Sequence, residues 1–157
     1  MSHFIIIWHV FALNLISTVH FNLSNQHSTI NISYIMNKIL DIQQSIIAAN
    51  GNISLAKDLF AMLLDDLDVR RRQIEECFQS DDMQMLEEHI HKLYGATAYC
   101  IVPKLRDSTE TLENLLRKKD YSQIKGYVDL VLEEIQQLIS HGPNFIKEDW
   151  VEYQTTN

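Results

Sequence analysis

Glycine and proline are scarce in this chain of 157 residues, which contains four glycines and two prolines. β-Hairpins and glycine-rich phosphate loops need these residues for their turns, so few places along the chain could hold either structure. The P-loop pattern of nucleotide-binding enzymes is also missing. These absences predict a helical protein without a nucleotide-binding loop of its own.

Positive charge and cysteine are scarce as well. Lys and Arg number 13 against 21 Asp and Glu, the formal net charge is −8, and no basic run is longer than the arginine triplet at 70–72. Such a charge balance lacks the basic surface of a nucleic-acid binder. Cys77 and Cys100 match neither a paired C-x-x-C metal pattern nor a disulfide framework, and both suit small apolar positions of a helical core. The composition therefore indicates a protein of the reducing cytoplasm.

The first 37 residues contain no Asp, Glu, Lys or Arg. Within them, residues 4–23 are long enough to cross a bilayer, but two histidines and two asparagines interrupt this stretch and no basic flank precedes it. We expect residues 1–34 to be a poorly ordered leader or a membrane-associated or partner-bound segment, ending in a polar linker. A true membrane span through residues 4–23 is the less favoured alternative.

Apolar residues recur at intervals of three and four from residue 35 onward, which predicts five helices. The expected ranges are about 35–49, 53–78, 81–99, 103–116 and 121–140. The short connections favour antiparallel neighbours, so we predict an all-α fold, an antiparallel up-down four-helix bundle with a short leading N-terminal helix. The bundle domain would cover residues 35–141, with 142–157 as a C-terminal tail.

Capping residues mark the ends of the predicted helices. The Asn50-Gly51 pair suits a stop for the first helix, and Asn52 can cap the second. Asp81 with Gln84 resembles a capping box for the third. The two prolines supply the remaining signals: Pro103 suits the first turn of the fourth helix, and Gly142-Pro143 a stop for the fifth.

The stretch EEHIHKLYGATAYC, residues 87–100, carries two histidines on the third predicted helix. The helix presents Leu86, Ile90 and Leu93 to the core, and each residue advances by about 100° around its axis. His91 then points about 130° away from the core direction, toward solvent, whereas His89 lies about 70° away on the other side, at the core boundary.

Gly95 follows His91 by one turn on the same outer face, and Ala98 by two. A glycine inside a helix costs about 1 kcal/mol relative to alanine, and no core contact requires one there. Close approach of another molecule explains it better, with a crossing helix as the alternative. An exposed, uncrowded imidazole suits nucleophilic acceptance of a phosphoryl group, and the adjacent Lys92 could stabilise the added charge or be a solvated lysine.

The runs HKLYGATAYCIVPKLR, residues 91–106, and ILDIQQSIIAANGNISLAKDLFAMLLDDL, residues 39–67, resemble the histidine-containing phosphotransfer (HPt) domain of tripartite hybrid sensor kinases of the BarA type. The resemblance covers residues 35–140. In that family a histidine is followed four residues later by glycine; His91 with Gly95 fits, whereas His89 has Leu93 at that offset. The family often has lysine, sometimes histidine, at the position of Tyr94, and Lys92 is a candidate replacement for that charge.

The resemblance implies a cytoplasmic phosphorelay intermediate that takes a phosphoryl group from a receiver aspartate of a hybrid kinase and passes it to a response-regulator aspartate. His91 would be the phosphoryl acceptor, supported by Lys92, Tyr94, Gly95 and Ala98. No cofactor is expected on this chain, because the Mg²⁺ of such a relay belongs to the partner receiver. ATP-dependent kinase activity of its own is not expected.

Two other interpretations compete with phosphotransfer. A metal site formed by Glu87, His89 and His91 is disfavoured, because the two histidines point about 160° apart. A helical adaptor, tethered through residues 4–23, would make His91 incidental. Under the transfer hypothesis, the docking face centres on the acceptor and its small neighbours, with a rim at Glu87, Glu88, Tyr94 and the arginines at 70–72.

Overall fold

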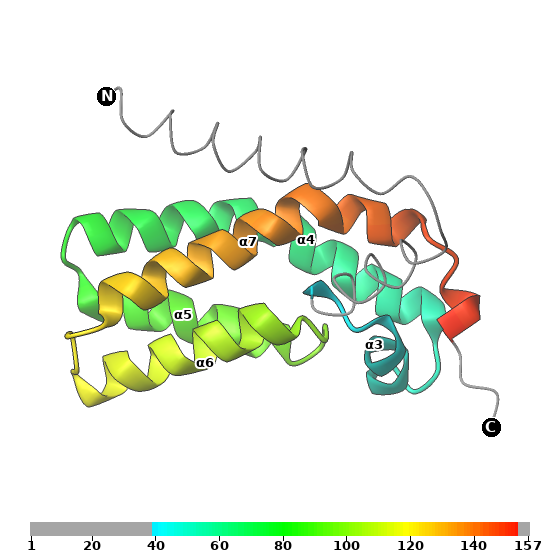
Figure 1. Ribbon diagram of the computed structural model, residues 1–157, viewed down its shortest axis with the longest axis horizontal. Helices are drawn as coiled ribbons and strands as arrows, with labels where there is room; N and C mark the ends of the chain where they lie inside the picture. Colours follow the sequence, from blue (N-terminus) through cyan, green and yellow to red (C-terminus); the bar gives the residue numbers. More distant parts are fainter. Residues whose placement is uncertain (1–38, 154–157) are drawn as a thin grey trace, which may run out of the picture. The chain divides into compact units, whose positions relative to one another are not determined.

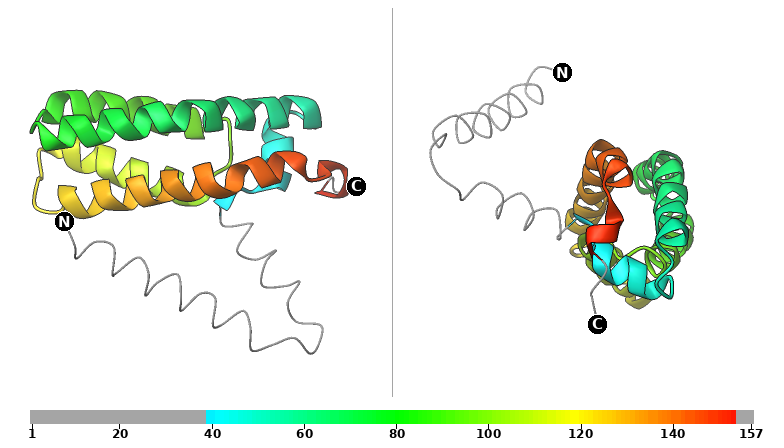
Figure 2. Two further views of the ribbon diagram at one scale, coloured as in Figure 1. Left: turned by 90° about the horizontal axis from the view of Figure 1, so that it is seen from above. Right: turned by 90° about the vertical axis from the view of Figure 1, so that its right-hand side faces the viewer.

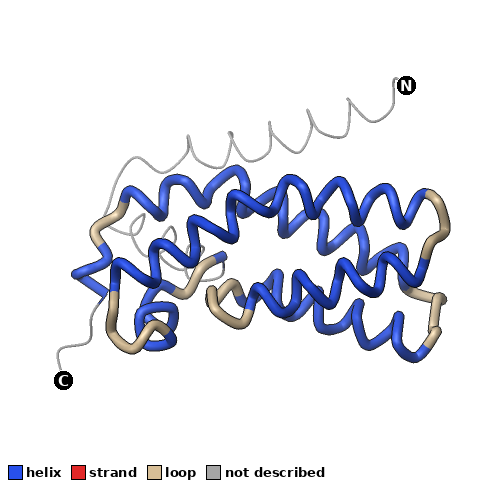
Figure 3. Tube along the Cα trace, turned by 180° about the vertical axis from the view of Figure 1, so that it is seen from behind, coloured by secondary structure: helices blue, strands red, loops and turns tan. Residues whose placement is uncertain are grey.

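The described part of this computed structural model, residues 39–153, contains helices and loops but no strand (Figure 3). The helices are α3 (Ile42–Ala48), α4 (Ile53–Gln79), α5 (Met83–Thr97), α6 (Pro103–Lys118), α7 (Ile124–Lys147) and the short 3₁₀ helix η1 (Trp150–Tyr153). The prediction of an all-α helical bundle is confirmed. The expectations for residues 1–34 fall outside the described residues.

Helices α4 to α7 form the bundle (Figure 1). α4 packs against α5 and α7, and α6 packs against the same two helices, so each helix has two neighbours. The chain reverses direction at every connection, and the end-on view shows the four helices around a common interior (Figure 2). α3 contacts α4 and η1 at one end of the bundle, where the Asp41 backbone N–H donates to the carbonyl of Ile101 at 2.8 Å.

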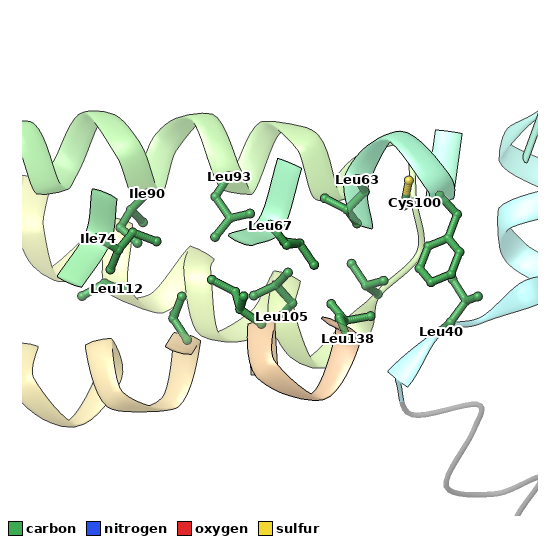
Figure 4. Packing of buried hydrophobic residues seen from close by; sticks show 14 of the residues in the cluster. Leu40, Leu63, Leu67, Ile74, Ile90, Leu93, Cys100, Leu105, Leu112 and Leu138 are labelled. Atoms are coloured by element: carbon green, nitrogen blue, oxygen red, sulfur yellow. The ribbon is translucent and has the colours of Figure 1, made fainter. Parts of the chain in front are cut away.

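The apolar stripe of each bundle helix faces the interior (Figure 4). Stripe residues from all four helices are fully or almost fully buried, including Phe60, Leu67, Ile74, Leu86, Ile90, Leu93, Leu105, Leu112, Val128, Val131 and Ile135. Cys100 joins this core, and burial raises the pKa of its thiol to about 11, so it remains protonated and packs as a small apolar group. Both cysteines are free.

Three helix starts differ from the predictions. Asp41 is extended and caps α3 by accepting from the Gln44 N–H at 2.9 Å, so the first helix does not run unbroken from residue 35. The capping box predicted at Asp81 places the N-cap of α5 one residue too early. The N-cap is Asp82, whose side chain accepts from the Met85 N–H at 3.0 Å. Asp81 instead adopts a φ of 59°, the left-handed conformation that reverses the chain after α4. The last of the three is that of α7, which begins at Ile124 and not near residue 121. The predicted starts at Asn52 and Pro103 are confirmed.

The predicted stop at Gly142-Pro143 is wrong, because α7 continues through both residues to Lys147. A proline inside a helix costs about 3 kcal/mol or more. Continuing the helix buries Phe145, which contributes about 1.5–3 kcal/mol, and brings Trp150 into the core, where neither side chain is more than 2% exposed. The gain from burial therefore offsets the cost of the proline.

Two contacts from α4 hold this extended end of α7. The Phe60 ring meets the Phe145 ring edge-on, with 6.3 Å between centroids. The Lys57 ammonium donates to the carbonyls of Ile146 at 3.2 Å and Glu148 at 2.6 Å, so it satisfies carbonyls that the end of the helix leaves free. Residues 142–153 are thus packed on the bundle.

Gly142 lets α7 approach α4 closely. A Cβ at this position would lie 2.4 Å from Cδ2 of Leu64, whereas a Cβ on Gly126, also inside α7, would meet nothing within 4 Å. We expect Gly142→Ala to destabilise the protein by about 1 kcal/mol, because overpacking costs about 1–3 kcal/mol and the gain in helix propensity returns about 1 kcal/mol. Gly126→Ala should stabilise it by about 1 kcal/mol. Urea unfolding measures both, and shifts of the same sign would contradict the close contact.

Candidate functional site

His91 projects from the middle of α5, and its side chain is 62% exposed. His89 is half-buried. The orientations predicted for the two histidines are therefore confirmed. These orientations could be predicted because the apolar stripe of α5 is buried, and the 100° rotation per residue then gives the direction of each of the other side chains.

Glu113 of α6 holds the His91 ring. Its Oε1 lies 2.6 Å from Nδ1 of His91, and its side chain is only 6% exposed. An ionised carboxylate can only accept hydrogen bonds. In the neutral ring, the proton is therefore on Nδ1, and this N–H donates a hydrogen bond to Glu113. The other ring nitrogen, Nε2, is left with its lone pair.

Arg117 completes a three-residue cluster. It lies one turn after Glu113 on α6, and its Nη2 donates to the same Glu113 oxygen at 2.6 Å. That nitrogen is also 3.5 Å from Nδ1 of His91. A buried carboxylate needs a positive or hydrogen-bonded partner, and Glu113 has both. The cluster therefore places a buried carboxylate, paired with a guanidinium, beside an exposed imidazole.

The structure pairs Lys92 and Tyr94 with other residues. The Lys92 ammonium donates to Glu88 at 2.5 Å along α5, and this hydrogen bond lowers the pKa of the Glu88 carboxyl below its ordinary value. The Tyr94 hydroxyl accepts from Arg106 of α6 at 3.4 Å, and the guanidinium lies 5.1 Å from the centre of the tyrosine ring. Within residues 39–153, neither side chain forms a hydrogen bond or an ion pair with the His91 imidazole.

Gly95 on α5 and Ala98, the C-cap residue that follows the helix, are both exposed and extend the open surface beyond His91. A Cβ added to Gly95 would meet nothing within 4 Å. Packing within the described part of the chain therefore gives no reason for a glycine there. The arginines at 70–72, which we placed on the rim, form ion pairs along α4 with Asp66, Asp68 and Glu75.

Among residues 39–153, no group of three or more His, Cys, Asp or Glu side chains is placed to hold a metal ion. No helix in that range is long and apolar enough to cross a membrane.

Sequence reasoning missed Glu113 and Arg117. A signal for Glu113 exists: it lies about 70° from the centre of the α6 stripe, at the edge of the core, where a carboxylate needs a partner. Which partner it finds depends on how α6 packs against α5, since His91 and Glu113 are 22 residues apart in the chain.

Comparisons with known proteins agree with this architecture. The profile of the Hpt domain matches residues 58–141, more than half of the chain. The sensor histidine kinase GacS of Pseudomonas protegens is 40% identical over 83 residues, which are 53% of this chain and 9% of that kinase. The signal transduction histidine-protein kinase BarA of Escherichia coli is 36% identical over 81 residues, 52% of this chain and 9% of BarA. The chain thus matches only a small part of these relatives.

A solved structure supports the fold. The HPT domain of a sensor hybrid histidine kinase from Shewanella superposes with a TM-score of 0.67 at 24% identity. The match covers 70% of this chain and 95% of that domain. With the profile match and the shared bundle, the evidence leads to one assignment: this chain belongs to the Hpt domain family.

Proposed function

We propose that this chain is a phosphorelay intermediate in which His91 accepts a phosphoryl group from a receiver-domain aspartate and passes it to a response-regulator aspartate. Membership of the Hpt family indicates phosphotransfer through a histidine. The observation that carries the assignment to His91 is its hydrogen bond to buried Glu113, which leaves Nε2 exposed as a nucleophile.

The chemistry follows from this hydrogen bond. The Nε2 lone pair attacks the phosphorus of the aspartyl phosphate, so an N–P bond forms while the P–O bond to the aspartate breaks. The bonding electrons leave with the aspartate carboxylate, and no proton has to move. The ring becomes positively charged as it reacts, and the Glu113 carboxylate stabilises that charge through the Nδ1 proton. Delivery to the second aspartate reverses these steps.

The partners in this proposal are the receiver domain of a hybrid sensor kinase and that of a response regulator, in the cytoplasm. Each receiver would supply the Mg²⁺ that neutralises its own acidic site. This chain would contribute the nucleophile and an accessible surface around it. The docking face would centre on His91, Gly95 and Ala98, with Glu87, Glu88 and Tyr94 as its rim.

Gly95 provides a test of this docking face. Gly95→Gln should slow transfer from a phosphorylated receiver by about 10- to 100-fold, because a side chain one turn from His91 displaces the incoming phosphoryl group. The bundle should remain folded, since a Cβ there meets nothing within 4 Å. Gly126→Gln makes the same change on the exposed surface of α7 and should leave transfer unchanged. Equal transfer rates for the two variants would contradict a docking face at Gly95.

The direct test of the proposed function uses a receiver protein carrying a radiolabelled phosphoryl group on its aspartate. The purified chain should acquire label that is labile in acid and stable in alkali, as expected of phosphohistidine. A second, unlabelled receiver should then remove it. A chain that binds receivers but never acquires label would instead be an adaptor.

A further inference from the structure

Three cationic side chains lie on or next to the turns of α5 around His91. Lys92 is bound to Glu88, and Arg106 is stacked over Tyr94. Arg117 alone among them has a recorded contact with the imidazole, with Nη2 3.5 Å from Nδ1. Its side chain is 55% exposed, so the guanidinium lies at the surface beside the same ring that would carry a phosphoryl group on Nε2.

We propose that Arg117 of α6 binds the phosphoryl group on His91 and supplies the positive charge that α5 does not place there. This inference rests on the proposed function and names the residue that stabilises the transferred group. A phosphoryl group carries up to about two negative charges. In the transfer step the N–P bond forms and the P–O bond breaks as described above, and Arg117 donates N–H groups to phosphoryl oxygens without exchanging a proton.

The pairing of Arg117 with Glu113 is compatible with this role. A guanidinium has five N–H donors in a planar fork, and the bond to Glu113 involves only Nη2. The remaining donors are not used by that bond, so they are available to phosphoryl oxygens while it persists. Glu113 then anchors the guanidinium beside the ring, so little side-chain freedom is lost when the phosphoryl group arrives.

Two other roles for Arg117 would give different experimental results. Arg117 could serve only to keep the buried Glu113 ionised, and its removal would then act through Glu113 alone. It could also contact a receiver protein directly, and its removal would then matter only when the donor is a protein. The experiment has to separate both roles from binding of the phosphoryl group.

Phosphoryl uptake is therefore measured with two donors, a phosphorylated receiver and the small molecule phosphoramidate. Arg117→Ala should slow uptake from both donors by about 10- to 100-fold, as expected for the loss of a charge-assisted hydrogen bond. Arg117→Lys should restore part of the rate. Lys118→Ala removes the same charge from the neighbouring exposed position of α6 and should leave both rates unchanged.

A double-mutant cycle with Glu113→Gln isolates the contact with the phosphoryl group. Arg117→Ala should still slow uptake in the Glu113→Gln background, and thermal unfolding should show every variant folded. Loss of the effect in that background, or an effect with the receiver donor only, would overturn the inference. So would wild-type rates in Arg117→Ala, which would leave the proposed function intact. A wild-type chain that takes label from neither donor would overturn both.

Discussion

His91→Gln is expected to abolish phosphoryl uptake from a phosphorylated receiver, while His89→Gln retains it. Glutamine can occupy the volume of the imidazole but has no basic ring nitrogen to attack phosphorus. His91 is 62% exposed, the glutamine amide still offers an N–H donor to Glu113, and Arg117 keeps its ion pair with that carboxylate, so the variant should remain folded. Loss of label would then report chemistry and not unfolding.

His89→Gln is the matched control because it makes the same substitution two residues away on the same helix. His89 is half-buried on the opposite flank of α5 from His91. The measurement is the amount of acid-labile label on each variant after equal exposure to the labelled receiver. If the His91→Gln variant acquired as much label as the wild type, the phosphoryl acceptor would have to be another residue.

Trp150→Ala should destabilise the protein by about 3–5 kcal/mol. Trp150 is fully buried, its Nε1 donates to the Phe145 carbonyl at 2.8 Å, and its ring centroid lies 6.4 Å from that of Phe60. The Lys57 ammonium lies 5.5 Å from the same ring. Removing the indole would leave a cavity and take away one of the two hydrogen bonds to the Phe145 carbonyl, which also accepts from the Glu148 N–H at 3.2 Å. The total stability of such a protein is expected to be about 5–15 kcal/mol.

Urea unfolding of the two variants Trp150→Ala and Val151→Ala measures this effect. Val151 is 59% exposed beside the buried tryptophan, so its truncation should change stability by no more than about 0.5 kcal/mol. A Trp150→Ala variant as stable as the wild type would show that residues 142–153 contribute little to the bundle. The expected loss would show that they are part of its core.

Periodicity in the sequence predicts the buried face of each bundle helix, because apolar side chains at three- and four-residue intervals can be buried on one side only. The same reasoning orients His91. It fails at Gly142-Pro143, where local rules predict a stop but burial of Phe145 and Trp150 favours continuation. That balance depends on contacts with α4, which the local sequence does not encode.

The polar contacts of the site also depend on how the helices pack against one another. His91 and Gly95 belong to one helix, and their spacing alone indicates an open surface around an imidazole. Glu113 and Arg117 come from α6, and their contacts with His91 exist only once α5 and α6 are packed together. Sequence reasoning therefore finds the histidine that we propose as the nucleophile but not the two α6 residues that contact it. It named Lys92 as a candidate for the supporting charge, or else a solvated lysine, and the structure pairs this residue with Glu88.

The central claim is that His91, held through Nδ1 by Glu113, carries the phosphoryl group on Nε2. Phosphorus–nitrogen correlation by NMR on the phosphorylated, ¹⁵N-labelled chain tests it most directly. The account predicts that phosphorus couples to Nε2 of His91 while Nδ1 keeps its proton. Coupling to Nδ1, or a phosphoryl group on any other residue, would contradict it.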